Sequence, residues 1–147
     1  MYPVGFNRAT RGSRWEAPAS VQVASNNSVS LETRLSLGAH DVATVAGDIT
    51  LRITDGSERF VPLGAGQPEL VNPGEYCYVD GSDEVLCRLE HRQCEKTKLT
   101  ADSSRAFYII QGNARTSSAL LEEALRRLVD LTRRFCGGHE EQFWIID

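Results

Sequence analysis

The chain has 147 residues, with 41% hydrophobic residues, 24% charged residues and a net charge of −4 at pH 7. These values fit a single globular domain that buries its own core without disulfides or metal. No apolar run approaches the roughly 20 residues of a membrane span, and the N-terminus lacks the apolar segment of a secretory signal. We therefore expect a cytoplasmic protein with no membrane partner. The acidic total also argues against tight nucleic-acid binding, because phosphate contacts dominate that affinity.

The N-terminal half shows weak signals for secondary structure. Residues 1–20 are rich in Pro, Gly and Arg and predict an irregular arm, which leaves 21–147 as one domain. A capping signature at Asn26-Asn27-Ser28 predicts a short helix over 29–35, and valines three apart predict a helical turn within 39–46. Apolar residues that alternate over 49–53 predict a half-buried strand, and 59–62 predict a second short strand. The Gly- and Pro-containing stretch 63–74 predicts a long loop at the rim of a pocket.

A β-hairpin is the clearest feature of the middle of the chain. Residues 75–80 and 85–89 are rich in aromatic and β-branched residues and flank the turn Asp80-Gly81-Ser82-Asp83, which is a strong hairpin signal. Cys77 and Cys87 are equidistant from Ser82 in this turn. Because there is no secretory signal, we expect two buried reduced thiols in preference to a disulfide.

The C-terminal half predicts a buried strand and a long helix. The apolar run 106–110 follows a turn at 100–104 and fits a strand covered on both faces. Thr116-Ser117-Ser118 precedes a helix over 119–135, with a buried face that includes Leu121, Leu125, Leu128, Thr132 and Phe135. Gly137 is placed to end this helix, and 142–146 can add a last strand. The fold class predicted is α/β, with α+β as the alternative, in which a mixed sheet is flanked by helices.

The polar segment 90–98 concentrates reactive side chains. His91-x-x-Cys94 together with Cys136-x-x-His139 could form a Cys2His2 zinc site, but Cys136-Gly137 is already explained as a helix end. Cys94 could pair with His91 or His40 as a nucleophile, although no flanking signature supports it. We therefore predict no metal or other cofactor.

A third group of candidate residues is polar and would act without forming a covalent bond to the substrate. A carboxylate of Asp48 or Glu95 would hold an α-ammonium group, and His91 or Thr97 would position a water molecule near an ester carbonyl. The predicted catalytic residues are His91, Glu95 and Thr97, and the predicted substrate-binding residues are Asn27, Asp48, Arg52, Arg88 and Lys98. The structural alternative is that these charges form ion pairs. Lys96 and Lys98, on one face of an extended segment, would meet phosphates or solvent.

Four stretches together resemble the editing domain of the phenylalanyl-tRNA synthetase beta subunit, and are most similar to the free-standing proteins that carry that domain alone. The stretches are Asn27-Ser28-Val29-Ser30-Leu31, the segment 47–52, the pair Pro73-Gly74-Glu75 with Tyr78-Val79-Asp80, and Leu86-Cys87-Arg88 running to Thr97-Lys98-Leu99-Thr100. The resemblance covers roughly residues 20–138 and includes the helix end Arg133–Gly138. Two departures are a shortened N-terminal part and Leu89-Glu90-His91-Arg92 in place of a Trp-rich stretch.

This resemblance implies an editing-type hydrolase of a mischarged aminoacyl ester, with tRNA as a partner. The departures favour an alternative in which the same fold binds or transforms a small amino-acid-like metabolite in a biosynthetic pathway. A second alternative is a non-catalytic binding or assembly module. A shortened N-terminal part would expose apolar surface for a second copy, so a homo-oligomer is also an expectation.

Overall fold

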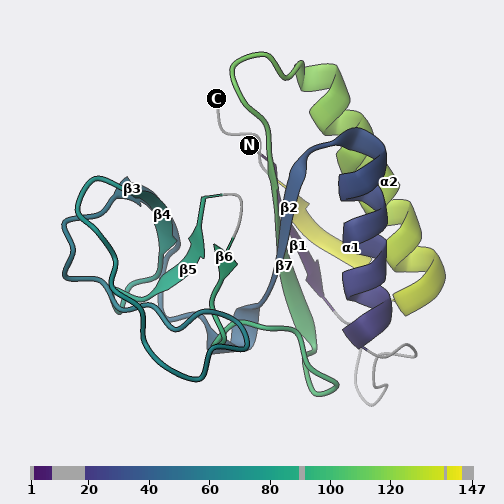
Figure 1. Cartoon of the computed structure of the whole chain (residues 1–147). Coiled ribbons are helices and arrows are strands. Elements are labelled where there is room, and N and C mark those ends of the chain that lie inside the picture. The colour runs from purple at the N-terminus through teal and green to yellow at the C-terminus, as the bar shows by residue number, and fades with distance from the viewer. Residues whose placement is uncertain (1, 8–18, 90–91, 138, 144–147) are drawn as a thin grey trace. The chain divides into compact units, whose positions relative to one another are not determined.

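The computed structural model describes residues 2–7, 19–89, 92–137 and 139–143 (Figure 1). The chain forms two compact units: unit 1 comprises Met1–Asp41 and Leu99–Asp147, and unit 2 comprises Val42–Lys98. Each unit contains one four-stranded sheet, and all pairings between named strands are antiparallel. The predicted α/β class with a long C-terminal helix is confirmed. In the described part of the chain, no helix is long and apolar enough to cross a membrane.

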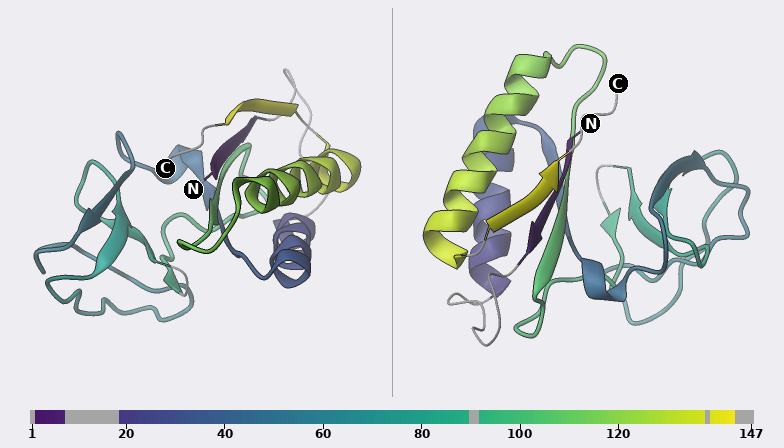
Figure 2. Two further views of the ribbon diagram at one scale, coloured as in Figure 1. Left: turned by 90° about the horizontal axis from the view of Figure 1, so that it is seen from above. Right: turned by 180° about the vertical axis from the view of Figure 1, so that it is seen from behind.

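Unit 1 is a sheet covered on one face by two helices. The strands are β2 (Ser36–Asp41), β7 (Arg105–Gln111), β1 (Tyr2–Asn7) and β8 (His139–Phe143), in that spatial order. Helices α1 (Ala19–Thr33) and α2 (Ser118–Cys136) lie side by side on one face (Figure 2). The buried core between these layers consists of Val29, Leu35, Ala39, Ala106, Tyr108, Ile110, Leu121, Ala124, Leu125 and Leu128.

Helix α2 follows the sequence prediction closely. The hydroxyl of Ser117 accepts a hydrogen bond from Leu120 N at 3.2 Å and caps the first turn. The predicted apolar face is buried with one exception: Phe135 is 50% exposed, and Cys136 is buried instead. Residue 136 continues the i, i+4 spacing from Thr132, which explains the exchange. Gly137 ends the helix with a φ of 70°.

The N-terminal half departs from the sequence predictions. Helix α1 begins at Ala19, so the asparagines expected to cap it lie inside it, and Asn26 instead donates a hydrogen bond to Leu37 O at 3.2 Å. Of the range 39–46, expected to hold a helical turn, residues 39–41 instead belong to β2, and a short 3-10 turn, η1 (Val42–Thr44), follows. Within the range predicted to be irregular, Tyr2–Asn7 forms β1. The division into an arm over 1–20 and a domain over 21–147 stays a prediction.

Unit 2 is built on the predicted hairpin. Its strands are β3 (Thr50–Ile53), β4 (Tyr76–Val79), β5 (Val85–Arg88) and β6 (Arg92–Gln93), in that spatial order. The second predicted strand, at 59–62, makes only isolated bridges. The alternation in β3 does not bury Leu51 and Ile53, which are 39% and 56% exposed.

A register shift in the hairpin separates the two cysteines. An irregularity next to Tyr78 pairs this residue with Cys87, and Cys77 then faces Arg88. All four cysteines are free thiols, as expected. Burial raises the pKa of Cys77 to about 11 and that of Cys87 to about 12, which keeps both protonated at neutral pH.

Acid should destabilise the fold through His40 on β2. This side chain is fully buried, and burial lowers its pKa from 6.5 to about 4. The unfolded chain therefore binds this proton more readily, so the free energy of unfolding should fall between pH 6.5 and 4, by up to ~3 kcal/mol. Urea unfolding of wild type and His40→Leu across this range measures the effect. Parallel pH profiles for the two proteins would contradict it.

Candidate functional site

Unit 2 contains a pocket of about 450 Å³. Two chain segments and one hairpin residue line it: Glu58, Arg59, Phe60, Val61, Pro68, Glu69, Leu70, Val71 and Glu84. Phe60 and Val71 are almost completely buried, whereas Leu70 is 76% exposed. A backbone hydrogen bond from Glu69 N to Phe60 O, 2.9 Å long, ties the two segments together. The predicted rim loop thus supplies part of the pocket lining.

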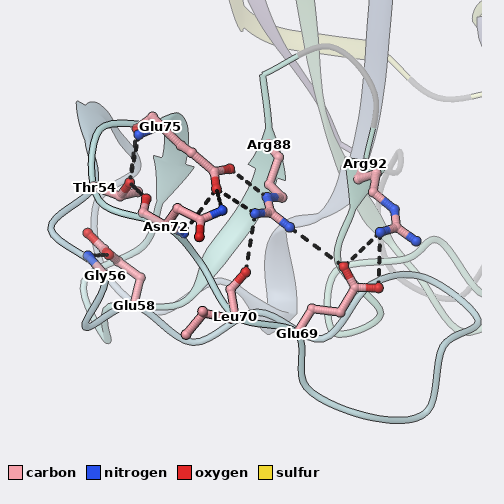
Figure 3. Close-up of polar contacts among 9 residues, drawn as sticks. All are labelled: Thr54, Gly56, Glu58, Glu69, Leu70, Asn72, Glu75, Arg88 and Arg92. Carbon is pink, nitrogen blue, oxygen red and sulfur yellow. Dashed lines mark hydrogen bonds and ion pairs between the residues drawn. The ribbon is translucent and has the colours of Figure 1, made fainter.

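Arg88 on β5 holds the loop in place (Figure 3). Its guanidinium forms a two-pronged contact with Glu75, with Nε–Oε2 and Nη2–Oε1 distances of 2.8 and 2.6 Å. The same group donates to Leu70 O at 3.2 Å, and it lies 5.2 Å from the centre of the Phe60 ring. The hydrogen bond from Arg88 is the main reason that the pKa of Glu75 falls to about 2. Arg88 therefore stabilises the loop that lines the pocket.

Each of the three lining carboxylates already has a cationic partner. Glu69 accepts two hydrogen bonds from Arg92 Nη1, at 2.7 and 3.0 Å (Figure 3). Glu84 lies 3.0 Å from Lys96 Nζ. Glu58 has a fully buried side chain that accepts from Gly56 N at 3.0 Å and lies 3.3 Å from Arg52. These pairs leave the pocket walls close to neutral.

The hairpin turn is organised by Asp80. Its carboxylate accepts from Lys96 Nζ at 2.8 Å, Ser82 Oγ at 2.7 Å and Ala46 N at 3.1 Å. Burial raises the pKa of Asp80, but these hydrogen bonds outweigh it and keep the pKa well below its ordinary value. Lys96 is thus held against the turn and does not project beside Lys98 as predicted, because residues 95–98 form a turn and not an extended segment.

The predicted site residues are mostly engaged with other protein groups. Arg52 contacts Asp83 at 2.6 Å, and Glu95 pairs with Lys98 while it accepts from Gly64 N at 2.9 Å. The ion pair considered between Asp48 and Arg52 is not formed; Asp48 is exposed and makes no hydrogen bond or ion pair with any described residue.

The remaining predicted site residues are Thr97, Asn27 and His91. Thr97 is fully buried, with Oγ1 lying 3.2 Å from the sulfur of Cys94. Asn27 is exposed on α1, in the other unit. His91 lies outside the described residues. The structure thus brings Glu95 and Lys98 together, and it places none of the described predicted residues in the pocket lining. Their roles in binding and catalysis stay predictions.

Sequence reasoning missed Glu58, Phe60, Glu69 and Glu84 as pocket residues. Only one signal was present: Asp55-Gly56-Ser57 is a turn sequence, and a carboxylate just after it can satisfy the turn's N–H groups. The nucleophile considered, Cys94, is fully buried. Of the Cys2His2 set considered, His91 and the side chain of His139 lie outside the part of the chain that the structure describes. The described residues contain no group of three or more metal-ligating side chains.

Replacing Arg88 by Lys should destabilise the protein by about 1–3 kcal/mol, because a lysine cannot make the two-pronged contact with Glu75. The matched control is Arg59→Lys, since Arg59 is exposed and its side chain, among the described residues, donates only to Ser82 O at 3.3 Å. Urea unfolding of the three proteins gives the comparison. Equal stability of wild type and Arg88→Lys would refute a supporting role for Arg88.

Comparisons with known proteins agree on the fold. A family model described as B3/4 domain matches residues 16–137. The structure is similar to an N-terminal fragment of the phenylalanyl-tRNA synthetase beta subunit from Pyrococcus horikoshii, with a TM-score of 0.70 and 17% sequence identity. The match covers 95% of this chain and 45% of the fragment, so the chain spans less than half of its length. No curated protein sequence matches the chain.

Proposed function

Because the chain belongs to the B3/4 domain family, we propose that it hydrolyses the ester bond of a mischarged aminoacyl-tRNA. The observation that carries this proposal is the family match, which extends over most of the chain. The fold shared with a phenylalanyl-tRNA synthetase beta-subunit fragment is consistent with it. The sequence motifs that resemble the editing domain of that subunit point to the same reaction.

The pocket in unit 2 is the proposed place for the amino-acid side chain. A volume of about 450 Å³ lies within the range of small-molecule sites. Its apolar lining residues are the exposed Leu70 and the almost completely buried Phe60 and Val71, and the paired carboxylates give its walls little net charge. Arg59 is the lining residue whose charge is not paired with a carboxylate in the described part of the chain, so it is available to an anionic group of the substrate.

The sequence-based roles can be narrowed by the contacts of each residue. Asp48 is the stronger candidate for the α-ammonium group, because Glu95 is already bound to Lys98 and Gly64. His91 is the stronger candidate for positioning water, because the hydroxyl of Thr97 is buried against Cys94. An aminoacyl ester is already activated, so positioning and proton transfer supply the catalysis required.

One observation favours the alternative of a small amino-acid-like metabolite. The basic residues of the segment 88–98 form ion pairs with carboxylates inside unit 2, and these include Lys96 and Lys98, which could have met tRNA phosphates; the four residues are Arg88, Arg92, Lys96 and Lys98. Cations that are already neutralised contribute less to the electrostatic affinity for nucleic acid. Under this alternative, the protein acts on a small ester or amine, and tRNA does not change the rate.

The deciding assay is hydrolysis of a panel of correctly and wrongly charged aminoacyl-tRNAs, alongside the matching aminoacyl ethyl esters. We expect release of one mischarged amino acid from tRNA and loss of this activity in His91→Ala. Turnover of the small ester alone would support the metabolite alternative. No turnover of either substrate class would contradict both enzymatic readings and leave the non-catalytic module.

Filling the pocket should test where the amino acid binds. Leu70→Trp places a larger side chain at the pocket, and we expect kcat/KM to fall at least about tenfold, or ~1.4 kcal/mol. Leu63→Trp is the matched control, because Leu63 is 53% exposed on the same loop but does not line the pocket. Equal kcat/KM for the two variants would place the amino-acid site elsewhere.

A further inference from the structure

The loop 46–50 is fixed at both ends on the β4–β5 hairpin. Its last residue, Thr50 on β3, pairs with Val79, the last residue of β4. Both backbone polar groups of its first residue, Ala46, form hydrogen bonds with the hairpin turn that follows Val79. The loop therefore begins and ends on neighbouring residues of one hairpin, and Asp48 lies at its centre.

Asp80 and Gly81 make the contacts with Ala46. The carboxylate of Asp80 accepts from Ala46 N at 3.1 Å, and Gly81 N donates to Ala46 O at 2.6 Å. A Cβ atom on Gly81 would lie only 2.9 Å from Ala46 O. Since Gly81 is not among the residues with a positive φ, this close approach of two backbones, and not an unusual conformation, requires the glycine. A side chain at this position would have to displace the loop.

Asp48 differs from the carboxylates of the hairpin turn in having no partner. Three other carboxylates lie in or next to the turn, and each has a cationic group within 3.0 Å: Asp80, Asp83 and Glu84. Asp48 is exposed and makes no hydrogen bond or ion pair with any described residue. It is therefore the carboxylate of this region that is available to a cationic group of a ligand.

We propose that Asp80 and Gly81 are positioning residues for the α-ammonium group of the substrate, because they fix the loop that carries the Asp48 carboxylate. The proposal rests on the proposed function, in which Asp48 binds this group. The same turn is closed by a hydrogen bond from Asp80 N to Glu84 O at 3.0 Å, and Glu84 lines the pocket. One hairpin turn thus connects the α-ammonium subsite to the side-chain pocket.

This connection matters because an amino acid carries its α-ammonium group and its side chain on one carbon atom. Their spacing is fixed by the covalent structure of the substrate, so the protein has to match it. A displacement of about 1 Å in a binding group can reduce a rate roughly 100-fold. A turn that holds Asp48 and borders the pocket keeps the two parts of the site in register.

NMR titration of the full chain with amino-acid amides tests the subsite without requiring hydrolysis. Each amide is compared with its N-acetyl derivative, which keeps the side chain and lacks the positive charge. We expect wild type to bind at least one amide at least about tenfold more tightly than its N-acetyl derivative, and Asp48→Asn to lose this preference. Binding of no amide, or equal binding of each pair, would overturn the proposal.

Gly81→Ala tests the positioning. We expect the preference for the α-ammonium form to fall at least about threefold, because the added methyl group displaces Ala46 and the loop. The ratio of the two affinities is the informative readout, since general damage to the pocket weakens both ligands alike. Ser82→Ala is the matched control: its hydroxyl bonds to Asp80 at 2.7 Å, and the preference should persist. An unchanged preference in Gly81→Ala, or an equal loss in both variants, would refute the positioning role.

Asp48→Glu provides a second test that does not depend on how well Gly81→Ala folds. Asp48 is exposed and unpaired among the described residues, so the longer side chain keeps the charge and moves the carboxylate without disturbing the fold. We expect a reduced preference for the α-ammonium form. A preference equal to that of wild type would show that the position of the carboxylate is unimportant and would overturn the proposal.

Hydrolysis of the aminoacyl-tRNA panel by the same samples separates this proposal from the proposed function. A preference for the α-ammonium form without any hydrolysis contradicts the hydrolase and leaves the subsite in place. Hydrolysis by wild type, together with an amide preference that Asp48→Asn does not change, contradicts the subsite alone.

Discussion

The two-pronged contact between Arg88 and Glu75 is the interaction on which the candidate site depends. It joins β5 to the residue that precedes β4, and the same guanidinium reaches Leu70 O and the face of Phe60. The loop 63–74 contains no strand or helix, so contacts of this kind must fix its conformation. Because charge-assisted, two-pronged hydrogen bonds are strong and directional, one side chain can order a long loop and the pocket that it borders.

The sequence predicts those elements whose signals are local. Helix α2 has a cap, a regular apolar face and a terminal glycine, and the hairpin has a turn sequence between two strand-forming runs. Helix α1 was foreseen only in part, because it is rich in Ser and Asn, and it buries Gln22 and Asn26 together with Val29. Such a helix is stabilised by tertiary packing more than by its own propensity. Strand β1 contains Pro3 and Gly5, and its pairing with β7 and β8 outweighs these breakers.

The candidate site could be predicted only as a region. The sequence indicated the loop 63–74, which supplies part of the pocket lining, and the polar segment 90–98, whose described residues do not line the pocket. It could not show which charges neutralise one another. The partners are distant along the chain: Arg88 and Glu75 are 13 residues apart, Arg92 and Glu69 are 23 apart, and Arg52 and Asp83 are 31 apart. An isolated charge and a paired charge look the same in a sequence, and only the fold distinguishes them.

Internal charge pairing has a consequence for selectivity under the proposed function. Glu75 and Asp80 both have lowered pKa values, so these carboxylates stay ionised across the physiological range and hold the loop and the hairpin turn in place. Because the lining carboxylates are all paired, Arg59 carries the one unpaired charge of the pocket among the described residues, and the pocket has little charge with which to distinguish one neutral side chain from another. It would therefore select aminoacyl groups by size and apolar fit, where one methylene contributes about 1–3 kcal/mol. The size of the pocket is then set by Phe60, Val71 and Leu70. Arg88 controls this size indirectly, because it holds the loop in position.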